Sequence, residues 1–295
     1  MRRPAAEVAL PERSSSRERF DRAARSFQTA SFVHDEARRR LLDRLDGLKI
    51  ESGTIVDLGS ALGQSAAELS RKFPEARIIA LDSSREMLKR SVPGEFSKLA
   101  GDAVRLPFPD RSIELLFANL VLPWNLPDAL FAEAGRVLTN TGVLVFSTLG
   151  PDSLNELRRA WARADDAIHV HAFFDVQTLG DLVQNARLEE PVLDVDRIQV
   201  SYAELSAVIR DLRACGATNT AGGRRRSLMG RGRWQRFVEA LWHNQGEGHE
   251  GRLSLTVELI FGQAFGIRRA PKAAENGEIS VPIDQIKRAS KRKAR

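Results

Sequence analysis

The sequence contains little cysteine, with Cys215 the only one among 295 residues. A single thiol forms no internal disulfide and cannot build a cysteine-based zinc site, so a reducing, cytoplasmic setting is expected. Long hydrophobic runs are also missing, because no apolar stretch approaches the roughly 20 residues that span a bilayer. The N-terminal residues carry arginines and a short apolar patch but lack the hydrophobic region of a signal peptide. These absences argue against a disulfide-stabilised or membrane-bound protein.

Aromatic residues make up only 6% of the chain, whereas hydrophobic residues make up 42% and charged residues 28%. This balance is typical of a soluble globular protein and excludes disorder as the main state. The formal net charge is +6, and basic residues gather in a tail over residues 267–295 that is predicted to be flexible. The tail is either a solvated end or a segment that steers an acidic partner. No nucleic-acid role is expected, since no recognition motif accompanies the basic residues.

The order of predicted elements indicates an α/β fold. A flexible N-terminus over 1–16 precedes a helical cap over 17–50. Short apolar strands then alternate with helices, which predicts a parallel sheet with helices on both faces. Predicted strands cover 54–58, 77–81, 97–100, 113–118, 143–148, 192–200 and 253–261; predicted helices cover 64–73, 84–91, 128–138, 154–164, 175–186, 203–214 and 233–243. The last two helices form a helical insertion, about 203–250, before the last strand, and the whole domain is expected to cover 17–266.

The stretch TIVDLGSALGQS, residues 54–65, is the most informative motif. Asp57 ends the first predicted strand, and Gly59 and Gly63 bracket the turn into the next helix, with Ser60 and Ala61 between them. Glycine lets the backbone approach a ligand closely, and open α/β sheets bind ligands at the carboxyl ends of their strands. The spacing differs from the dinucleotide-binding G-x-G-x-x-G pattern, and a purely structural turn would also account for it.

Polar residues also follow the next strands. Asp82 ends the second strand, where an acid can accept hydrogen bonds from ribose hydroxyls. Asp102 and Ala103 follow the third strand, and the run from Asn119 to Trp124 follows the fourth. Each has a plainer interpretation, since Asp82 can cap a helix and Trp124 can be core. Together they predict a nucleoside pocket, whose candidate cofactor-binding residues are Asp57, Gly59, Ser60, Ala61, Gly63, Asp82, Ser83, Asp102, Ala103 and Asn119.

This spacing resembles the class I S-adenosylmethionine (SAM)-dependent methyltransferases. More specific segments resemble the malonyl-acyl-carrier-protein O-methyltransferase family of biotin synthesis, over roughly residues 16–266. They are RFDRAARSF (19–27), LPFPDRSIELLFANLVLPW (106–124), RVLTNTGVLVFSTLGPDSLNELR (136–158), DLRACGATNT (211–220), GRRRSLMGRGRWQRF (223–237) and LTVELIFGQAFG (255–266). The resemblance implies a Rossmann-like, seven-stranded class I methyltransferase sheet whose last strand is antiparallel.

The resemblance also implies a reaction, the transfer of the methyl group of SAM to the free carboxylate of a malonyl thioester on acyl carrier protein. A carboxylate is ionised near pH 7, so no catalytic base is needed, and no metal is expected. Acyl carrier protein is acidic, so a basic docking surface is expected. The candidates for substrate positioning are Phe27, Trp124, His169, Arg210 and Arg226. Two alternatives remain open: a relative with another substrate, as in the similar assembly factors of respiratory complex I, and a non-catalytic protein that binds a partner.

Four residues depart from the family pattern. Ser60 replaces a cysteine of the glycine turn, Pro123 stands where a polar residue is common, and Ala61 and Phe27 are the other two. Ala61 stands where the family has the middle glycine of the turn, so its methyl group either weakens cofactor binding or is accommodated by a negative φ. Phe27 stands where the family often has a tyrosine, and the hydroxyl is therefore missing.

Overall fold

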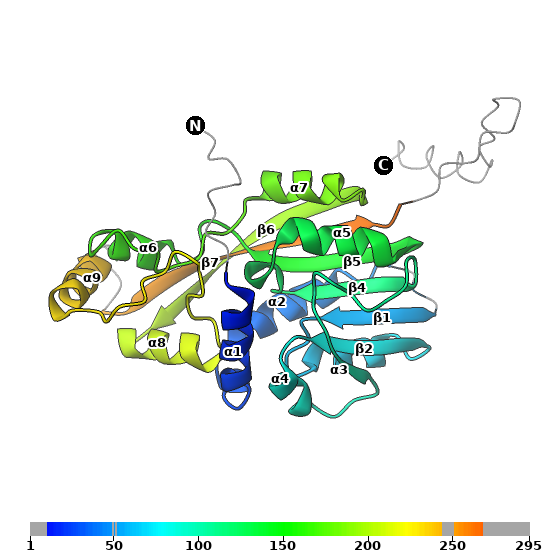
Figure 1. Cartoon of the computed structure of the whole chain (residues 1–295), viewed down its shortest axis with the longest axis horizontal. Coiled ribbons are helices and arrows are strands. Elements are labelled where there is room, and N and C mark those ends of the chain that lie inside the picture. Colours follow the sequence, from blue (N-terminus) through cyan, green and yellow to red (C-terminus); the bar gives the residue numbers. More distant parts are fainter. Residues whose placement is uncertain (1–10, 49, 51, 244–250, 268–295) are drawn as a thin grey trace, which may run out of the picture.

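A seven-stranded sheet runs through the centre of the molecule, in the order β3-β2-β1-β4-β5-β7-β6 (Figure 1). The computed structural model describes residues 11–48, 50, 52–243 and 251–267. The strands are β1 (Gly53–Leu58), β2 (Ala76–Asp82), β3 (Ser97–Ala100), β4 (Ile113–Asn119), β5 (Leu138–Leu149), β6 (Glu189–Tyr202) and β7 (Leu253–Phe265). The helices are α1 (Arg13–Ala23), η2 (Phe27–Thr29), α2 (Phe32–Asp43), α3 (Gln64–Lys72), α4 (Arg85–Lys89), η3 (Leu122–Trp124), α5 (Pro127–Val137), α6 (Asn155–Ala162), α7 (Val176–Asn185), α8 (Leu205–Ala214) and α9 (Arg231–His243).

Strands β1 to β5 are parallel, whereas β7 lies between β5 and β6 and is antiparallel to both. The predicted seven-stranded sheet with an antiparallel last strand is therefore confirmed. The chain runs outward from β1 to β3 and then returns to β4 on the other side of β1. In such sheets the crevice for a ligand opens beyond the carboxyl ends of the strands, where the order reverses. Here that point lies between β1 and β4.

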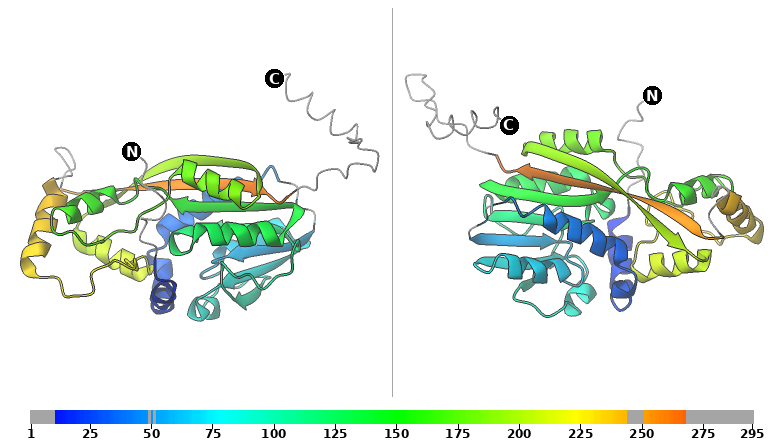
Figure 2. Two further views of the ribbon diagram at one scale, coloured as in Figure 1. Left: turned by 45° about the horizontal axis from the view of Figure 1, so that its top comes forward. Right: turned by 180° about the vertical axis from the view of Figure 1, so that it is seen from behind.

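The two faces of the sheet follow from the alternation of apolar side chains along each strand. Leu116 and Phe146 point to the face covered by α5 and α7, whereas Phe117 and Val145 point to the face covered by α2 and α3. The green helices α5 and α7 lie in front of the sheet in the left view of Figure 2, and the blue helix α2 lies in front of it in the right view, from behind. Because both faces are covered, the central strands contain almost continuous hydrophobic runs, as the sequence predicted.

The N-terminal cap differs from its predicted form. A helical cap was predicted over 17–50, and the structure has two helices there, α1 and α2, joined by the short η2 turn. Helix α1 also begins at Arg13, inside the segment predicted to be flexible, and residues 1–10 lie outside the described residues. The start of α1 is held by Glu12, whose carboxylate pairs with Arg224 and Arg226. Local sequence could not reveal this anchor, because its partners lie more than 200 residues away.

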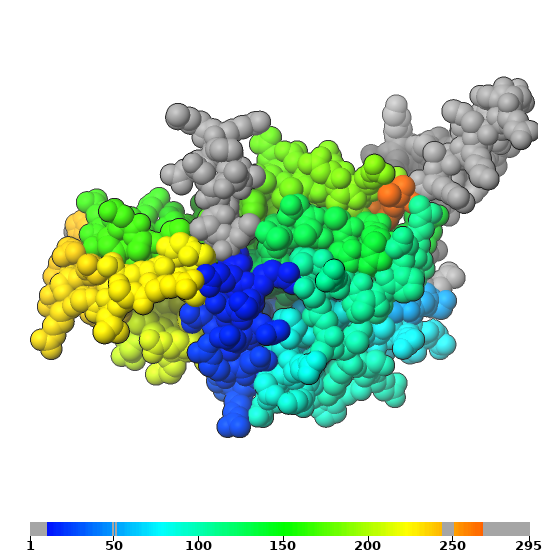
Figure 3. All heavy atoms as spheres, viewed as in Figure 1, coloured from blue at the N-terminus to red at the C-terminus, as the bar shows by residue number. Residues whose placement is uncertain are grey.

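The insertion before the last strand is confirmed as helical. Helices α8 and α9 pack with α6 around buried residues such as Val208 and Phe237 (Figure 1). The insertion is tied to the N-terminal cap, because the Thr220 hydroxyl lies 2.9 Å from that of Ser16 in α1, and Ser26 Oγ, just before η2, donates to the Ala214 carbonyl. The space-filling view shows α1 beside the insertion and against the sheet domain (Figure 3). Residues 244–250 of the insertion and the tail from residue 268 lie outside the described residues.

None of the described helices is long and apolar enough to cross a membrane.

Candidate active site

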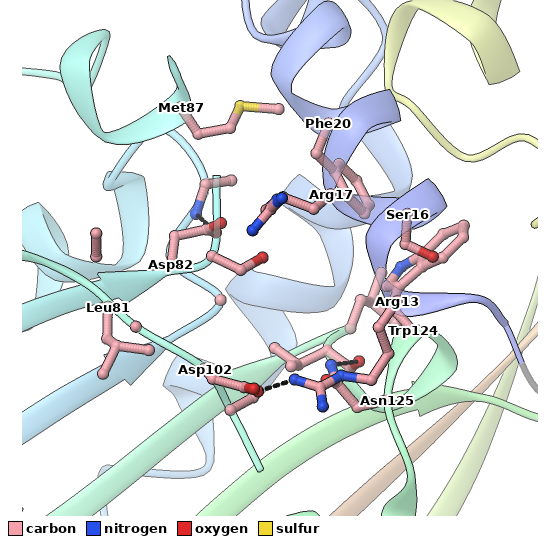
Figure 4. A pocket seen from close by; sticks show the side chains of 18 of the residues that line it. Arg13, Ser16, Arg17, Phe20, Leu81, Asp82, Met87, Asp102, Trp124 and Asn125 are labelled. Atoms are coloured by element: carbon pink, nitrogen blue, oxygen red, sulfur yellow. Dashed lines mark hydrogen bonds and ion pairs between the residues drawn. The ribbon is translucent and has the colours of Figure 1, made fainter. Parts of the chain in front are cut away.

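A cavity of about 530 Å³ lies at the carboxyl ends of β1, β2 and β4, beneath helix α1. The turn after β1 forms one wall, and the segment after β3 forms another. Figure 4 shows Asp82 and Asp102 on the sheet side of the cavity, and Arg13, Arg17 and Phe20 entering it from α1. The cavity therefore lies where the sequence predicted a nucleoside pocket, and α1 covers it.

The turn after β1 has a left-handed backbone at alternate positions. The φ angles are +66° at Gly59, +48° at Ala61 and +74° at Gly63. A Cβ atom on Gly59 would come within 2.5 Å of Val121 Cγ2, so this position requires glycine. Ala61 is in the conformation that glycine favours, and the negative φ considered for it is not observed. Its methyl group is accommodated at the cavity wall with backbone strain.

Asp82 organises this turn. Its Oδ2 accepts a hydrogen bond from the Ala61 N–H at 2.9 Å, and its Oδ1 accepts one from the Ser84 N–H at 2.7 Å. Burial raises the pKa of Asp82 to about 6. The carboxylate thus holds the turn in place and also lines the cavity, where it can accept hydrogen bonds from a ligand.

Two buried polar atoms behind the turn have no hydrogen-bond partner among the described residues, Asp57 Oδ2 and Ser60 Oγ. Burial raises the pKa of Asp57 to about 8, with Asp82 a smaller cause. An unpaired buried polar group is costly, so such atoms are typical of sites whose ligand completes the network.

Helix α1 closes the cavity through polar contacts that sequence reasoning did not anticipate. The Arg13 guanidinium pairs with the Asp102 carboxylate, as the dashed line in Figure 4 shows. At the other end of the helix, Ser84 Oγ donates a hydrogen bond to Asp21 Oδ1 at 2.6 Å. The sequence predicted a flexible N-terminus over 1–16 and a helical cap from 17 onward, and neither interpretation placed this segment against the cavity.

A second cavity, of about 270 Å³, adjoins the first and is bounded by α2, α6, α8, α9 and β7. Its walls are largely apolar. Trp161 is one of its lining residues and is stacked between His169 and Phe237, with ring centroids 3.8 Å apart on each side. His34, Leu120 and Trp124 line both cavities and therefore mark the place where the two meet. Leu120 also has a left-handed backbone, with φ +53°.

The structure gathers most of the predicted site residues. Those that line the first cavity are Phe27, Gly59, Ala61, Asp82, Ser83, Asp102, Ala103, Asn119 and Trp124. His169 lines the second cavity, whereas Asp57, Ser60 and Gly63 are buried and line neither cavity. Arg210 and Arg226 line neither cavity, and Arg226 is paired with Glu12.

His169 has a structural partner, because its Nε2 lies 2.7 Å from Asp165 Oδ1, and Asp165 also pairs with Arg225. No group of three potential metal ligands occurs among the residues that the structure describes. Sequence reasoning missed His34 altogether, since a histidine within a predicted helix gives no signal of a site.

Known proteins similar to this chain give the family. A model described as a methyltransferase domain matches residues 56–146. The malonyl-[acyl-carrier protein] O-methyltransferase of Laribacter hongkongensis is 38% identical over 280 residues, which cover 90% of this chain and 93% of that protein. The protein of that name from Halorhodospira halophila is 35% identical over 94% of this chain and 96% of its own length. The chain belongs to the malonyl-acyl-carrier-protein O-methyltransferase family.

Solved structures agree on the fold. YcgJ of Bacillus subtilis superimposes with a TM-score of 0.54 at 16% identity, covering 79% of this chain and 98% of its own. A methyltransferase-like protein of Bacillus halodurans gives a TM-score of 0.52 at 15% identity, over 77% and 97% of the two chains. At such identities the likeness concerns the class I methyltransferase fold alone. The predicted fold class and family are both confirmed.

Proposed function

We propose that this protein methylates the free carboxylate of a malonyl thioester carried by acyl carrier protein, with SAM as the methyl donor. The observation that carries the proposal is the extent of the family match. Relatives of that name cover about 90% of the chain, far more than the methyltransferase domain at residues 56–146. Helix α1 and the α8–α9 insertion lie outside residues 56–146 and supply walls of the first and the second cavity, respectively.

The first cavity suits SAM in size and polarity. Its volume falls in the range of roughly 300–1,000 Å³ that is usual for small-molecule sites. We assign Asp82 to the ribose hydroxyls, Asp102 and Ala103 to the adenine edge, and the turn at Gly59 and Ala61 to the methionine part. The unpaired atoms behind that turn, on Asp57 and Ser60, support this assignment.

The protein's part in the chemistry is positioning and exclusion of water. Bound SAM supplies an electrophilic methyl group, which leaves its sulfur as the carboxylate oxygen bonds to carbon. The acceptor is already ionised at neutral pH, so no residue has to remove a proton. Helix α1 and Trp124 shield the meeting point of the cavities, and a dry, oriented site accelerates transfer between opposite charges. Trp124 is held edge-on by Phe20, with ring centroids 5.1 Å apart, and by His171, 5.2 Å apart.

The second cavity is the proposed site of the thioester and its arm. It begins at His34 and Trp124, where the carboxylate must meet the methyl group, and it extends under the insertion. Its apolar walls fit the uncharged part of the acceptor, while the charged carboxylate stays at the junction.

The insertion is also the proposed docking surface for the acidic carrier protein. Arg210, Arg213 and Arg231 are exposed and have no ion-pair partner in the part of the chain that the structure describes. Leu228, between arginines of the same region, is 95% exposed and offers an apolar contact. Arg225 and Arg226 are less suitable for testing docking, because they already pair with Asp165 and Glu12.

Docking is tested by reversing two exposed charges, Arg210→Glu and Arg213→Glu together. The expected result is a salt-dependent rise in KM for malonyl-carrier protein, with unchanged KM for malonyl-pantetheine, which has no protein to dock. Arg77→Glu, an exposed residue of β2 next to the edge strand β3, is the control, compared with each single reversal. If both substrates respond equally, or neither responds, the docking surface lies elsewhere.

A further inference from the structure

His34 lies where the two cavities meet. It is one of three residues that line both, together with Leu120 and Trp124. Its backbone is held from β4, since the Asn119 side-chain amide donates a hydrogen bond to the His34 carbonyl at 3.0 Å. Its ring lies edge-on to Phe27, with centroids 5.0 Å apart. The imidazole is therefore fixed beside both the donor and the acceptor sites.

The ring has unused hydrogen-bonding capacity. Nδ1 is buried and has no partner among the described residues. Because Nδ1 is enclosed by protein, a ligand in the cavities can reach the ring only through Nε2. Burial lowers the pKa of His34 to about 4, so the ring is neutral at pH 7 and carries one N–H. A neutral donor suits a site that also receives a sulfonium ion, because a cationic side chain there would repel it.

We propose that His34, through its Nε2–H, binds the acceptor carboxylate and holds one of its oxygens at the junction of the two cavities. This inference rests on the proposed function and adds to it the residue that recognises the carboxylate. The two arginines considered for substrate positioning are not at this place, since Arg210 and Arg226 line neither cavity. Among the residues shared by the cavities, His34 and Trp124 have side-chain N–H groups, and His34 is the one whose buried Nδ1 has no partner among the described residues.

The kinetic test compares His34→Phe with His34→Gln. Phenylalanine keeps an aromatic ring against Phe27 but removes the donor, whereas the glutamine amide can supply an N–H near the position of Nε2. Because a hydrogen bond to a charged group is strong, His34→Phe should raise KM for malonyl-pantetheine roughly tenfold to hundredfold. His34→Gln should recover most of that loss, and both variants should bind SAM as the wild type does. An unchanged KM in His34→Phe, or a fall in SAM affinity that accounts for the whole loss, would overturn the proposal.

A second measurement does not depend on turnover. Imidazole nitrogens are isotope-labelled and observed by NMR with S-adenosylhomocysteine bound, and the His34 signals are identified by their absence in His34→Phe. Malonyl-pantetheine should shift the Nε2 signal, whereas acetyl-pantetheine, which lacks a free carboxylate, should not. Equal responses to both thioesters, or to neither, would refute the contact. If the wild type methylates no malonyl thioester, the proposed function fails, and the malonyl-to-acetyl comparison still decides whether His34 binds the carboxylate.

Discussion

Ala61→Gly tests whether the turn at the donor cavity is strained. Ala61 has φ +48°, and its N–H is held by Asp82 Oδ2 at 2.9 Å. The left-handed region costs an L-residue about 1–2 kcal/mol relative to glycine. Glycine also gives the unfolded chain more conformational freedom, which reduces the stabilisation of the folded state by about 0.4–1 kcal/mol. The net expectation is a stabilisation of about 0.5–1 kcal/mol, equivalent to a rise in Tm of roughly 1–3 °C for a domain of this size.

The assay is thermal unfolding of the protein without ligand, followed by calorimetric titration with SAM. Arg111→Gly is the matched control, because Arg111 also has a left-handed backbone, with φ +54°, and is exposed outside both cavities. Both variants should gain stability. Only Ala61→Gly should bind SAM more tightly, because Ala61 lines the cavity and Arg111 does not. A Tm lowered by Ala61→Gly, with Arg111→Gly raised, would show that Ala61 stabilises the turn and that the strain argument is wrong.

Three further predictions concern charge and space in the site. Burial raises the pKa of Asp57 to about 8, so the folded state holds a proton that the unfolded chain has lost, and the free energy of unfolding should fall as pH rises from 6 to 8. In denaturant titrations Asp57→Asn should remove this fall. If the free energy of unfolding of Asp57→Asn still falls over this range, another group causes it. Arg13→Ala frees the Asp102 carboxylate and should make SAM bind more tightly. The gain in affinity should be no more than about fivefold, because the Arg13–Asp102 ion pair is half-exposed. Weaker binding of SAM would mean that Arg13 itself contacts the cofactor. Leu205→Trp fills the second cavity and should reduce the rate of methyl transfer by at least about tenfold, with the affinity for SAM unchanged. The control Leu126→Trp, at an exposed position, should leave the rate unchanged. If Leu205→Trp is as active as the wild type, the second cavity is not the acceptor site.

Much of the fold follows from local patterns in the sequence. Every predicted strand is present, because buried strands such as β1 and β4 have apolar runs bounded by turn residues. The residues after β1, β2 and β4 were also predictable, since the carboxyl ends of parallel strands meet at one edge of the sheet. Gly59, Asp82 and Asn119 accordingly line one cavity.

The features that sequence reasoning missed depend on distant contacts. Helix α1 begins at Arg13 because Glu12 meets Arg224 and Arg226, a pairing that no local pattern could indicate. His34 became a candidate only when the structure placed it at the junction of two cavities. Arg226 was a reasonable substrate-positioning candidate by residue type, but its ion pair with Glu12 holds it outside both cavities.

The most direct test of the account is methyl transfer itself. The purified full-length protein is incubated with SAM and malonyl-carrier protein, and the carrier protein is analysed by mass spectrometry. The account predicts a mass increase of one CH₂ unit, with one S-adenosylhomocysteine formed per methyl ester, and no change in acetyl-carrier protein, which has no free carboxylate. Binding of SAM without any transfer to malonyl-carrier protein would contradict the proposed function.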